Sequence, residues 1–381
     1  MPAEHTRRPR LIAVAGARPN FMKIAPLLRV LRNRGHLETR LVHTGQHYDA
    51  AMSDQFFAEL GIPEPDVNLG VGSGSHAQQT AEILRRMEPV LVEQAPDAVV
   101  VVGDVNSTVA ASLAAVKMGI PVAHVEAGLR SFDRSMPEEI NRLFTDQIAS
   151  WLFTTEPQAE ANLLREGIPG ERIHFVGNVM IDTLVEQLPR ARARDTLERL
   201  DLQPGAYGVL TLHRPSNVDD PERLRRIFAV LAEIQRGVPL VFPVHPRTQK
   251  ALESLLGEQG TAGLLTTPPL GYLDFLRLLA DARLVLTDSG GIQEETTFLG
   301  VPCLTLRDNT ERPVTVTHGT NTLVGGDPAM LLAAVREALA GTAREHRVPE
   351  LWDGRAAERI AAILERDLGD TGRAQRNGSG T

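Results

Sequence analysis

The stretch Leu284–Glu295, which reads Leu-Val-Leu-Thr-Asp-Ser-Gly-Gly-Ile-Gln-Glu-Glu, indicates both the fold and the kind of ligand. Its apolar start predicts a buried strand, and a helical spacing of apolar residues begins directly after Gly290 and Gly291. A strand that turns through glycines into a helix leaves the first N–H groups of the helix unpaired, and the helix dipole adds partial positive charge there. Such a turn suits a phosphate group, and a carboxylate in the first helical turn, from Glu294 or Glu295, could accept hydrogen bonds from ribose hydroxyls. The same pattern also begins ordinary helices in α/β proteins, so the remaining sequence has to decide between the two interpretations.

Composition narrows the possible partners. The 381 residues fit two domains of ordinary size, and 42% hydrophobic residues suffice for well-packed cores. An aromatic content of 4% argues against a surface that stacks nucleic-acid bases, and a net charge of −8 means that any phosphate site is local. No apolar run is long enough to cross a membrane, so neither nucleic acid nor membrane is predicted as a partner. The single cysteine, Cys303, lies in an apolar run that favours a core position, and its isolation suits a reducing cytoplasm.

Apolar strands alternate with amphipathic helices along almost the whole chain, which predicts parallel sheets covered by helices. We therefore expect an α/β protein with two Rossmann-like, doubly wound domains, at residues 1–180 and 181–355, with a hinge near residues 177–190. A last helix at residues 356–370 could pack back on the first domain, and the Gly/Ser/Asn-rich tail at 371–381 is predicted to be disordered. Ligands bind at the carboxyl ends of strands in such sheets, so a cleft between the domains is the expected site.

Charged residues in the first domain follow strands or begin helices. Carboxylates at three separate strand or loop ends are expected to converge on one site, although each alone could be a helix cap or a surface ion pair. Asp104 taken alone favours a helix cap, and Glu138 after Pro137 could stabilise a helix dipole. The candidates are Arg18, Lys23, Asp104, Glu126, Glu138 and Arg142.

In the second domain, two histidines follow predicted strands. His213 comes after residues 207–212 and could donate a hydrogen bond to a leaving phosphate, and His245 comes after residues 240–244. For each of them, a capping or solvated histidine is the alternative. Arg312 follows the strand that contains Cys303 and adds a cation to the same end of the sheet.

Several cofactor motifs are missing from the sequence. Neither HExxH nor CxxC is present, so no metal site is predicted, and the absence of GxxxxGK[ST] excludes a P-loop. The glycine-rich run Gly70–Ser75 follows no convincing strand, lacks the GxGxxG spacing, and has no acid placed for a nicotinamide ribose. We interpret it as a loop, which could also close over the cleft, and we predict no cofactor.

Six motifs stand in order along the chain. They are Gly16-Ala17-Arg18-Pro19 with Lys23; Gly103-Asp104-Val105-Asn106-Ser107-Thr108; His124-Val125-Glu126-Ala127-Gly128-Leu129-Arg130; Pro137-Glu138-Glu139-Ile140-Asn141-Arg142; Asp288-Ser289-Gly290-Gly291-Ile292-Gln293-Glu294-Glu295; and Arg307-Asp308-Asn309-Thr310-Glu311-Arg312-Pro313. With these motifs, the chain resembles the non-hydrolysing UDP-N-acetylglucosamine 2-epimerases from Gly16 to about residue 365. The resemblance implies the GT-B fold of nucleotide-sugar enzymes, a UDP-sugar substrate and a homodimer.

The resemblance also implies roles for individual residues. Asp104, Glu126 and Glu138 match catalytic acids, and Arg142 matches a supporting cation. The residues that match positions around the diphosphate and sugar are Arg18, Lys23, His213 and Arg312, with His213 counted among the catalytic groups. The residues that match the nucleotide site are Ser289, Gly290 and Gly291 for the diphosphate, Glu295 for the ribose and Phe275 for the uracil.

Two segments depart from the family pattern. Many bacterial members bind a second UDP-GlcNAc as an activator, through Gln-His-Arg-Gln and an arginine in a following loop. This chain has Gln46-His47-Tyr48-Asp49 instead, and its Gly70–Ser75 loop has no arginine. The segments at 44–54 and 70–76 resemble those of a branch acting on UDP-2,3-diacetamido-glucuronate. They also resemble those of plain UDP-GlcNAc epimerases, so the substituents at C3 and C6 of the sugar stay open.

Inversion at C2 poses a chemical problem, because the C2 proton of UDP-GlcNAc is not adjacent to a carbonyl group. With no nicotinamide site, the workable route is elimination of UDP to 2-acetamidoglucal, followed by re-addition of UDP and delivery of a proton to the other face. The alternatives are a GT-B glycosyltransferase, a hydrolysing epimerase and a non-catalytic nucleotide-sugar sensor.

Overall fold

The structure is a computed structural model that describes residues 7–46, 57, 59–244, 248–249, 252, 263–341 and 346–377. The chain divides into two compact units. Unit 1 comprises Met1–Thr183 together with Glu350–Thr381, and unit 2 comprises Leu184–Pro349. The sequence placed the division at residue 180 and ended the second domain at 355, whereas residues 350–355 group with unit 1.

In its described part, unit 1 contains a seven-stranded sheet in the order β3-β2-β1-β4-β5-β6-β7. All neighbouring strands run parallel. The strands are β1 (Arg10–Ala15), β2 (Glu38–His43), β3 (Val67–Asn68), β4 (Ala98–Val102), β5 (Val122–Ala127), β6 (Trp151–Thr154) and β7 (Ile173–Phe175). The central strand β4 reads Ala-Val-Val-Val-Val and is buried along its whole length, as expected for a strand covered on both faces.

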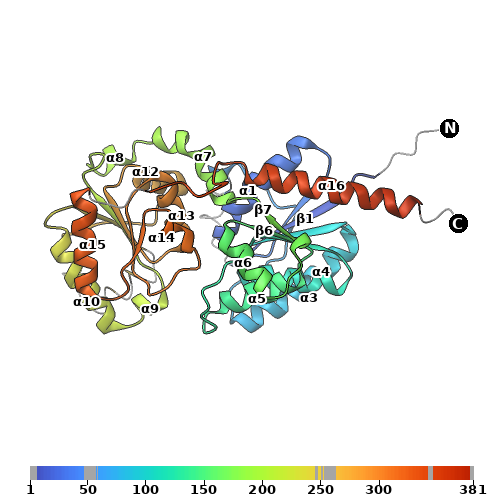
Figure 1. Cartoon of the computed structure of the whole chain (residues 1–381), viewed down its shortest axis with the longest axis horizontal. Helices are drawn as coiled ribbons and strands as arrows, with labels where there is room; N and C mark the ends of the chain where they lie inside the picture. Colours follow the sequence, from blue (N-terminus) through green and yellow to red (C-terminus); the bar gives the residue numbers. More distant parts are fainter. Residues whose placement is uncertain are drawn as a thin grey trace. The chain divides into compact units, whose positions relative to one another are not determined.

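Helices cover both faces of this sheet (Figure 1). Helices α3, α4 and α5 pack next to one another, while α1 packs with α16. The helices of unit 1 are α1 (Arg18–Arg34), α3 (His76–Gln94), α4 (Asn106–Lys117), α5 (Pro137–Ile148), α6 (Pro157–Arg165) and α16 (Ala356–Asn377), with α7 (Val179–Arg192) spanning the division between the units. Helix α3 begins with a capping box in which Ser75 accepts a hydrogen bond from the N–H of Gln78.

In its described part, unit 2 contains a six-stranded parallel sheet in the order β10-β9-β8-β11-β12-β13. The strands are β8 (Gly208–Thr211), β9 (Leu240–Pro243), β10 (Leu265–Thr267), β11 (Leu284–Thr287), β12 (Cys303–Thr305) and β13 (Asn321–Leu323). Its helices include α8 (Thr196–Arg199), α9 (Pro215–Val218), α10 (Pro221–Ile234), α12 (Tyr272–Ala280), α13 (Gly290–Leu299), α14 (Pro313–Thr317) and α15 (Pro328–Ala340). The predicted α/β class with two doubly wound units is confirmed.

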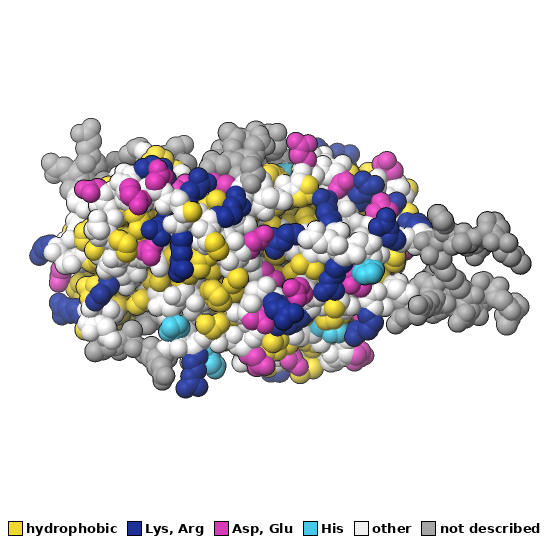
Figure 2. Space-filling model, turned by 90° about the horizontal axis from the view of Figure 1, so that it is seen from above, with side chains coloured by type: hydrophobic (Ala, Val, Ile, Leu, Met, Phe, Trp, Pro, Cys, Tyr) yellow, Lys and Arg dark blue, Asp and Glu magenta, His cyan; other side chains and the backbone are white. Residues whose placement is uncertain are grey.

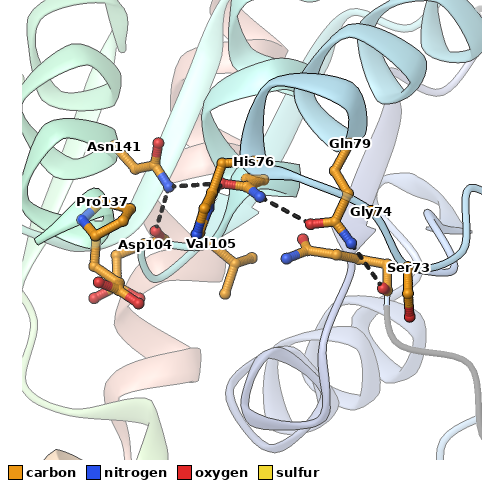
Figure 3. Close-up of a pocket in the computed structure, with 11 residues that line it drawn as sticks. Ser73, Gly74, His76, Gln79, Asp104, Val105, Pro137 and Asn141 are labelled. Carbon is orange, nitrogen blue, oxygen red and sulfur yellow. Dashed lines mark hydrogen bonds between the residues drawn. The ribbon is translucent and has the colours of Figure 1, made fainter. Parts of the chain in front are cut away.

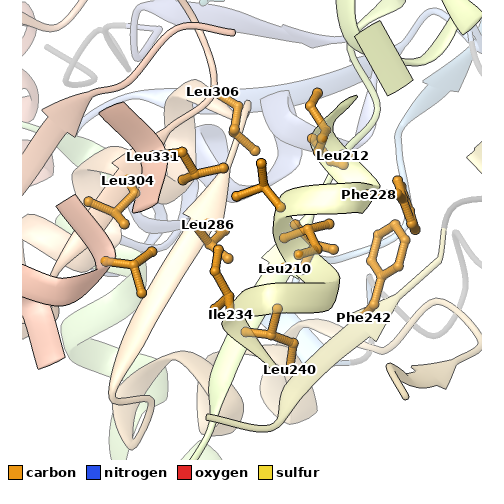
Figure 4. Packing of buried hydrophobic residues seen from close by; sticks show 14 of the residues in the cluster. Leu210, Leu212, Phe228, Ile234, Leu240, Phe242, Leu286, Leu304, Leu306 and Leu331 are labelled. Carbon is orange, nitrogen blue, oxygen red and sulfur yellow. The ribbon is translucent and has the colours of Figure 1, made fainter. Parts of the chain in front are cut away.

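The larger core of unit 2 lies between its sheet and helices α10 and α15 (Figure 4). Leu210 and Leu286 from neighbouring strands meet Phe228 and Ile234 from α10 in this cluster, and Leu331 joins it from α15. Burial of these large side chains supplies much of the free energy that holds the helices on the sheet.

The order of the strands reverses at one place in each sheet. In unit 1 the chain builds outward from β1 through β2 to β3, and then returns to place β4 on the other side of β1. Unit 2 repeats this pattern with β8 and β11. Ligands of such sheets bind beyond the carboxyl ends of the strands at this switch point. We therefore expect ligand contacts from the loops after β1, β4, β8 and β11.

The C-terminal segment is integrated into unit 1. The indole N–H of Trp352 donates to the carbonyl of Thr155, and the carboxylate of Asp182 accepts the N–H groups of Ala356 and Ala357 at the start of α16. Burial of Asp182 raises the pKa of its carboxyl group to about 6. Helix α16 continues to Asn377, beyond residue 370, where the sequence ended the predicted helix.

Good helix formers explain this extension, because residues 373–376 are all Arg, Ala or Gln.

None of the helices in the described part of the chain combines the length and apolar character needed to cross a membrane. On the face shown in Figure 2, lysine and arginine side chains are interspersed with aspartate and glutamate side chains. This mixed surface fits an acidic chain in which anion sites are local.

Gly177 provides a test of how the C-terminal segment docks. It has φ +87°, and a Cβ atom there would lie 2.1 Å from the carbonyl oxygen of Leu351. Gly167 has φ +81° with no neighbouring atom within 4 Å. We expect Gly167→Ala to cost about 1 kcal/mol for its backbone conformation alone, and Gly177→Ala to cost about 3 kcal/mol because Leu351 must also move.

Urea denaturation followed by tryptophan fluorescence measures both variants, since Trp151 and Trp352 are the two tryptophans of the chain and both belong to unit 1. Equal losses of stability in the two variants would show that the contact with Leu351 contributes nothing.

Candidate active site

The loop after β1 is fixed to the end of β4 by Asn20. The side-chain oxygen of Asn20 accepts the N–H groups of Gly16 and Ala17 at 3.2 and 3.0 Å, and its amide nitrogen donates to the carbonyl of Val102 at 3.0 Å. Arg18 is the first residue of α1, and its side chain lies outside the described part of the structure. The two strands at the switch point of unit 1 are therefore joined through one buried amide.

Lys23 and Glu126 form a buried ion pair next to this loop. The pair packs against Gly103, where a Cβ atom would lie 3.0 Å from the Lys23 Nζ and 3.7 Å from a Glu126 oxygen. Gly103 also has φ +67°. A glycine is needed here for both its conformation and its small size, and Asp104 follows it directly in the chain.

Glu126 lies inside a strand, which corrects the prediction that it follows a strand at residues 121–125. Strand β5 continues to Ala127, and its register with β6 shifts between Val125 and Ala127. Glu126 occupies this irregularity with φ +73°, a conformation that costs about 1–3 kcal/mol in a residue with a side chain. The bulge turns the carboxylate toward Lys23, and strain of this kind concentrates at functional sites.

Arg142 connects Asp104 to a second acid. Its guanidinium donates to Asp104 at 2.5 Å and to Glu139 at 2.7 Å. Although burial raises the pKa of Glu139, the N–H of Ser131 and the guanidinium of Arg142 together hold it below its ordinary value. The sequence identified Arg142 but not Glu139, whose spacing of three residues from Arg142 on a helix was the available signal.

Asp104 and Glu138 line one cavity of about 250 Å³ in unit 1 (Figure 3). The side-chain amide of Asn141 donates to the backbone carbonyl of Asp104 at 2.9 Å, and that of Asn106 donates to Gln79 at 2.9 Å. His76, Gln79, Asn106 and Asn141 also line the cavity and were not assigned roles from the sequence, although Asn106 and Asn141 stand within two of the six motifs. The arrangement places two carboxyl groups beside one cavity that is lined mainly by polar residues.

In unit 2, the buried carboxylate of Asp288 holds the loop after β8. It accepts the backbone N–H groups of His213 and Arg214 and the side-chain amide of Asn217. The His213 Nδ1 lies 2.9 Å from Asp288, and the His213 side chain is 47% exposed. Burial raises the pKa of Asp288, but these donors, with His213 the strongest, lower it overall. The imidazole is thus fixed by its Nδ1, which leaves Nε2 as the ring nitrogen that Asp288 does not engage.

Helix α13 begins where the sequence predicted a phosphate site. Ser289 precedes the helix without capping it through its side chain, so the first N–H groups are not satisfied by a cap. The Arg312 guanidinium lies over Gly290, where a Cβ atom would be 2.5 Å from its Nη1, and it pairs with Glu294 at 2.8 Å. A helix N-terminus next to an oriented guanidinium suits a doubly charged anion such as a diphosphate.

The nucleotide-side candidates lie in the same unit. Glu295 is buried and accepts a hydrogen bond from the Tyr272 hydroxyl at 3.1 Å, and burial raises the pKa of Glu295 to about 8. Phe275 is half-buried and packs against the core cluster formed by residues such as Tyr207 and Leu278. Gly291 is the second residue of α13 and follows Gly290 at the helix start.

Two other candidates do not enter the site. His245 lies outside the described residues. Cys303 is buried in β12 and burial raises the pKa of its thiol to about 11, so it is a core residue as predicted. The part of the chain that the structure describes contains no cluster of three or more His, Cys, Asp or Glu side chains arranged to hold a metal ion.

Comparison with known proteins shows extensive similarity. The sequence profile of the family described as UDP-N-acetylglucosamine 2-epimerase matches residues 29–365. The UDP-N-acetylglucosamine 2-epimerase of Methanocaldococcus jannaschii is 44% identical, over 93% of this chain and 98% of that protein. The UDP-2,3-diacetamido-2,3-dideoxy-D-glucuronate 2-epimerase of Pseudomonas aeruginosa is 42% identical, over 93% of this chain and 99% of its own.

Solved structures agree with these matches. The crystal structure of the M. jannaschii UDP-GlcNAc 2-epimerase in complex with UDP-GlcNAc and UDP superposes with a TM-score of 0.87, covering 93% of this chain and 99% of that one at 44% identity. The Neisseria meningitidis enzyme bound to UDP-GlcNAc superposes with a TM-score of 0.85 at 31% identity, covering 94% of this chain and 100% of that one. These neighbours confirm the predicted GT-B class of fold.

Sequence and structure therefore agree over 93% of the chain, and they show that this protein belongs to the UDP-N-acetylglucosamine 2-epimerase family, a family of isomerases.

Proposed function

We propose that the chain, acting as a homodimer, interconverts UDP-GlcNAc and UDP-ManNAc by eliminating UDP to 2-acetamidoglucal and adding it back. The observation that carries this proposal is the grouping of carboxylates in unit 1. Asp104 and Glu138 line one cavity, and Glu126 with Lys23 packs against the glycine that precedes Asp104.

The chemistry explains why several acids are needed. A base removes the C2 proton as the C1–O bond breaks, and the bonding pair leaves with the UDP phosphate oxygen. In the return step, the same oxygen attacks C1 while an acid delivers a proton to the opposite face of C2. Acid and base must stand on two faces of one carbon, and a group of carboxylates supplies both. Asp104, Glu126 and Glu138 share this work in the proposal.

The residues of unit 2 fit the departing nucleotide. The start of α13 and Arg312 would hold the diphosphate as negative charge develops on it, and His213, oriented by Asp288, would donate a hydrogen bond to a phosphate oxygen. Glu295 would accept ribose hydroxyls, and Phe275 would lie beside the uracil. Ser289, Gly290 and Gly291 would surround the diphosphate at the helix start.

Three cations of unit 1 also have roles in the proposal. Arg18 and Lys23 would stabilise the charge on the leaving group, and Arg142 would hold Asp104 in place. UDP has to stay bound until C2 is reprotonated, so these contacts would keep the nucleotide beside the glucal intermediate.

A second UDP-sugar is also a candidate substrate. The P. aeruginosa relative named for UDP-2,3-diacetamido-2,3-dideoxy-D-glucuronate is 42% identical, only slightly less similar than the M. jannaschii relative at 44%. The same C2 chemistry applies to both sugars, so substituents at C3 and C6 would distinguish them by fit alone.

Incubation of the purified protein with UDP-GlcNAc in D₂O, without any acceptor, tests the proposed function. We expect UDP-ManNAc to form and deuterium to appear at C2 of both sugars, because the base exchanges its proton with solvent. Proton NMR measures both changes. A parallel sample with UDP-2,3-diacetamido-glucuronate identifies the preferred substrate by its higher kcat/KM.

Other outcomes of the same experiment point to other functions. Release of free UDP and ManNAc would indicate a hydrolysing enzyme. Both sugars recovered unchanged and without deuterium would contradict the epimerase, and would favour a transferase or a binding protein.

The amide variants Asp104→Asn, Glu126→Gln and Glu138→Gln test the assignment of the acids. Each replacement keeps the shape of the side chain but removes its ability to exchange a proton, so we expect kcat to fall about 10²-fold or more in each. Initial rates of UDP-ManNAc formation measure the effect.

Glu88→Gln is a suitable control, since Glu88 is an exposed acid on α3 in the same unit. This variant should retain the rate of the unmodified protein. Turnover close to the unmodified rate in all three site variants would show that these carboxylates do not carry out the proton transfer.

A further inference from the structure

His124 is a fully buried histidine that the proposed chemistry does not use. It lies in β5 two residues before Glu126 and has 0% of its surface exposed. Its Nδ1 is 2.6 Å from Asp146, and its Nε2 is 2.8 Å from the carbonyl oxygen of Gly103. Both ring nitrogens therefore have a partner, and one of these partners is the residue that precedes Asp104.

The partners determine where the protons are. A carbonyl oxygen can only accept, so the Nε2 of His124 carries a proton and donates it to Gly103. Asp146 accepts the N–H of Gly128 at 3.1 Å and the Arg130 guanidinium at 2.7 Å through one oxygen, which is the environment of an ionised carboxylate. The other oxygen of Asp146 lies 2.6 Å from Nδ1, so each ring nitrogen of His124 faces an acceptor oxygen.

Groups of opposite charge lie close together around Asp146. Arg130 forms a two-pronged contact with Glu166, at 2.8 and 2.6 Å. If His124 is an imidazolium, it and Arg130 supply two positive charges against the two carboxylates of Asp146 and Glu166. Charges buried in this balanced, hydrogen-bonded form are tolerated in a protein interior.

Asp146 contacts both sides of Glu126. One of its oxygens holds the imidazole of His124, two residues before Glu126, and the other holds the N–H of Gly128, two residues after it. Gly128 has φ +80°, and a Cβ atom there would lie 2.4 Å from the carbonyl of Ala159. The strained backbone of Glu126 is therefore anchored at both ends by a single carboxylate.

The same contacts reach the neighbouring strand. The imidazole of His124 holds the Gly103 carbonyl, and the Gly103 N–H donates to Val125 at 3.0 Å. Gly103 is the residue against which Lys23 and Glu126 pack. One buried histidine thus links the turn that carries Asp104 to the strand that carries Glu126.

We propose that His124 and Asp146 are positioning residues of the reaction, which act as an imidazolium and a carboxylate to fix Glu126 and Asp104 relative to each other. This inference rests on the proposed function, because it assigns both carboxylates to proton transfer at C2. Neither His124 nor Asp146 touches the substrate in this account.

The variant Asp146→Asn tests the proposal. An amide cannot accept from His124, Gly128 and Arg130 together, so the carboxylates lose their relative placement while the nucleotide contacts of unit 2 stay intact. We expect kcat to fall roughly 10-fold to 100-fold with UDP affinity unchanged. The deuterium kinetic isotope effect with substrate labelled at C2 should rise, because proton transfer becomes more rate-limiting.

Glu166→Gln is the matched control. The Glu166→Gln variant alters the same group of charges from the far side of Arg130. The Glu166 side chain is 23% exposed, and its carboxylate pairs with Arg130 rather than with His124 or Gly128. A lower melting temperature is expected in both variants, but the isotope effect and kcat should change in Asp146→Asn alone. Equal changes of kcat in the two variants would show that this group of charged residues has only a structural role, and would overturn the proposal.

Nitrogen NMR of the unmodified protein provides a second measurement that needs no variant. Labelled His124 should show two protonated ring nitrogens, and a neutral ring would contradict the inference. An unmodified protein that is inert toward UDP-sugars would overturn the proposed function and this inference with it. Normal turnover in the unmodified protein and in Asp146→Asn would overturn the inference alone.

Discussion

The ion pair between Lys23 and Glu126 depends on the absence of a side chain at Gly103. The glycine has a left-handed backbone at the end of β4, and Glu126 has one inside β5, so two neighbouring strands depart from regular geometry at the same level of the sheet. These departures bring a cation and a carboxylate together next to Asp104. A regular β5 would continue its alternation of side chains, and Glu126 would then not face Lys23.

Each unit contains a histidine held by a buried aspartate, with different consequences. In unit 1, Asp146 and a backbone carbonyl occupy both ring nitrogens of His124, which has no exposed surface. In unit 2, Asp288 engages only the Nδ1 of His213, and almost half of that side chain is exposed. The first arrangement suits a residue that fixes other groups, and the second suits one that donates to a ligand.

Regular patterns allowed much of the molecule to be predicted from the sequence. The alternation of strands and helices predicted two doubly wound sheets, and the rule that ligands bind at the carboxyl ends of strands selected Asp104 and His213 at the switch points.

The bulge at Glu126 could not be predicted, because it depends on the register between β5 and β6. Asp146 stands within α5 with no local mark of its role, which arises only when α5 packs beside β5.

The central claim is that the C1–O bond of the UDP-sugar breaks and reforms while UDP stays bound. Positional isotope exchange tests it most directly, with substrate that carries ¹⁸O in the bridge between the sugar and the β-phosphate. If UDP leaves and returns, its phosphate can rotate before re-addition, and phosphorus NMR should find the label in non-bridging positions of the recovered UDP-sugars. Inversion at C2 with all of the label still in the bridge would contradict elimination, and the carboxylates of unit 1 would then need a different role.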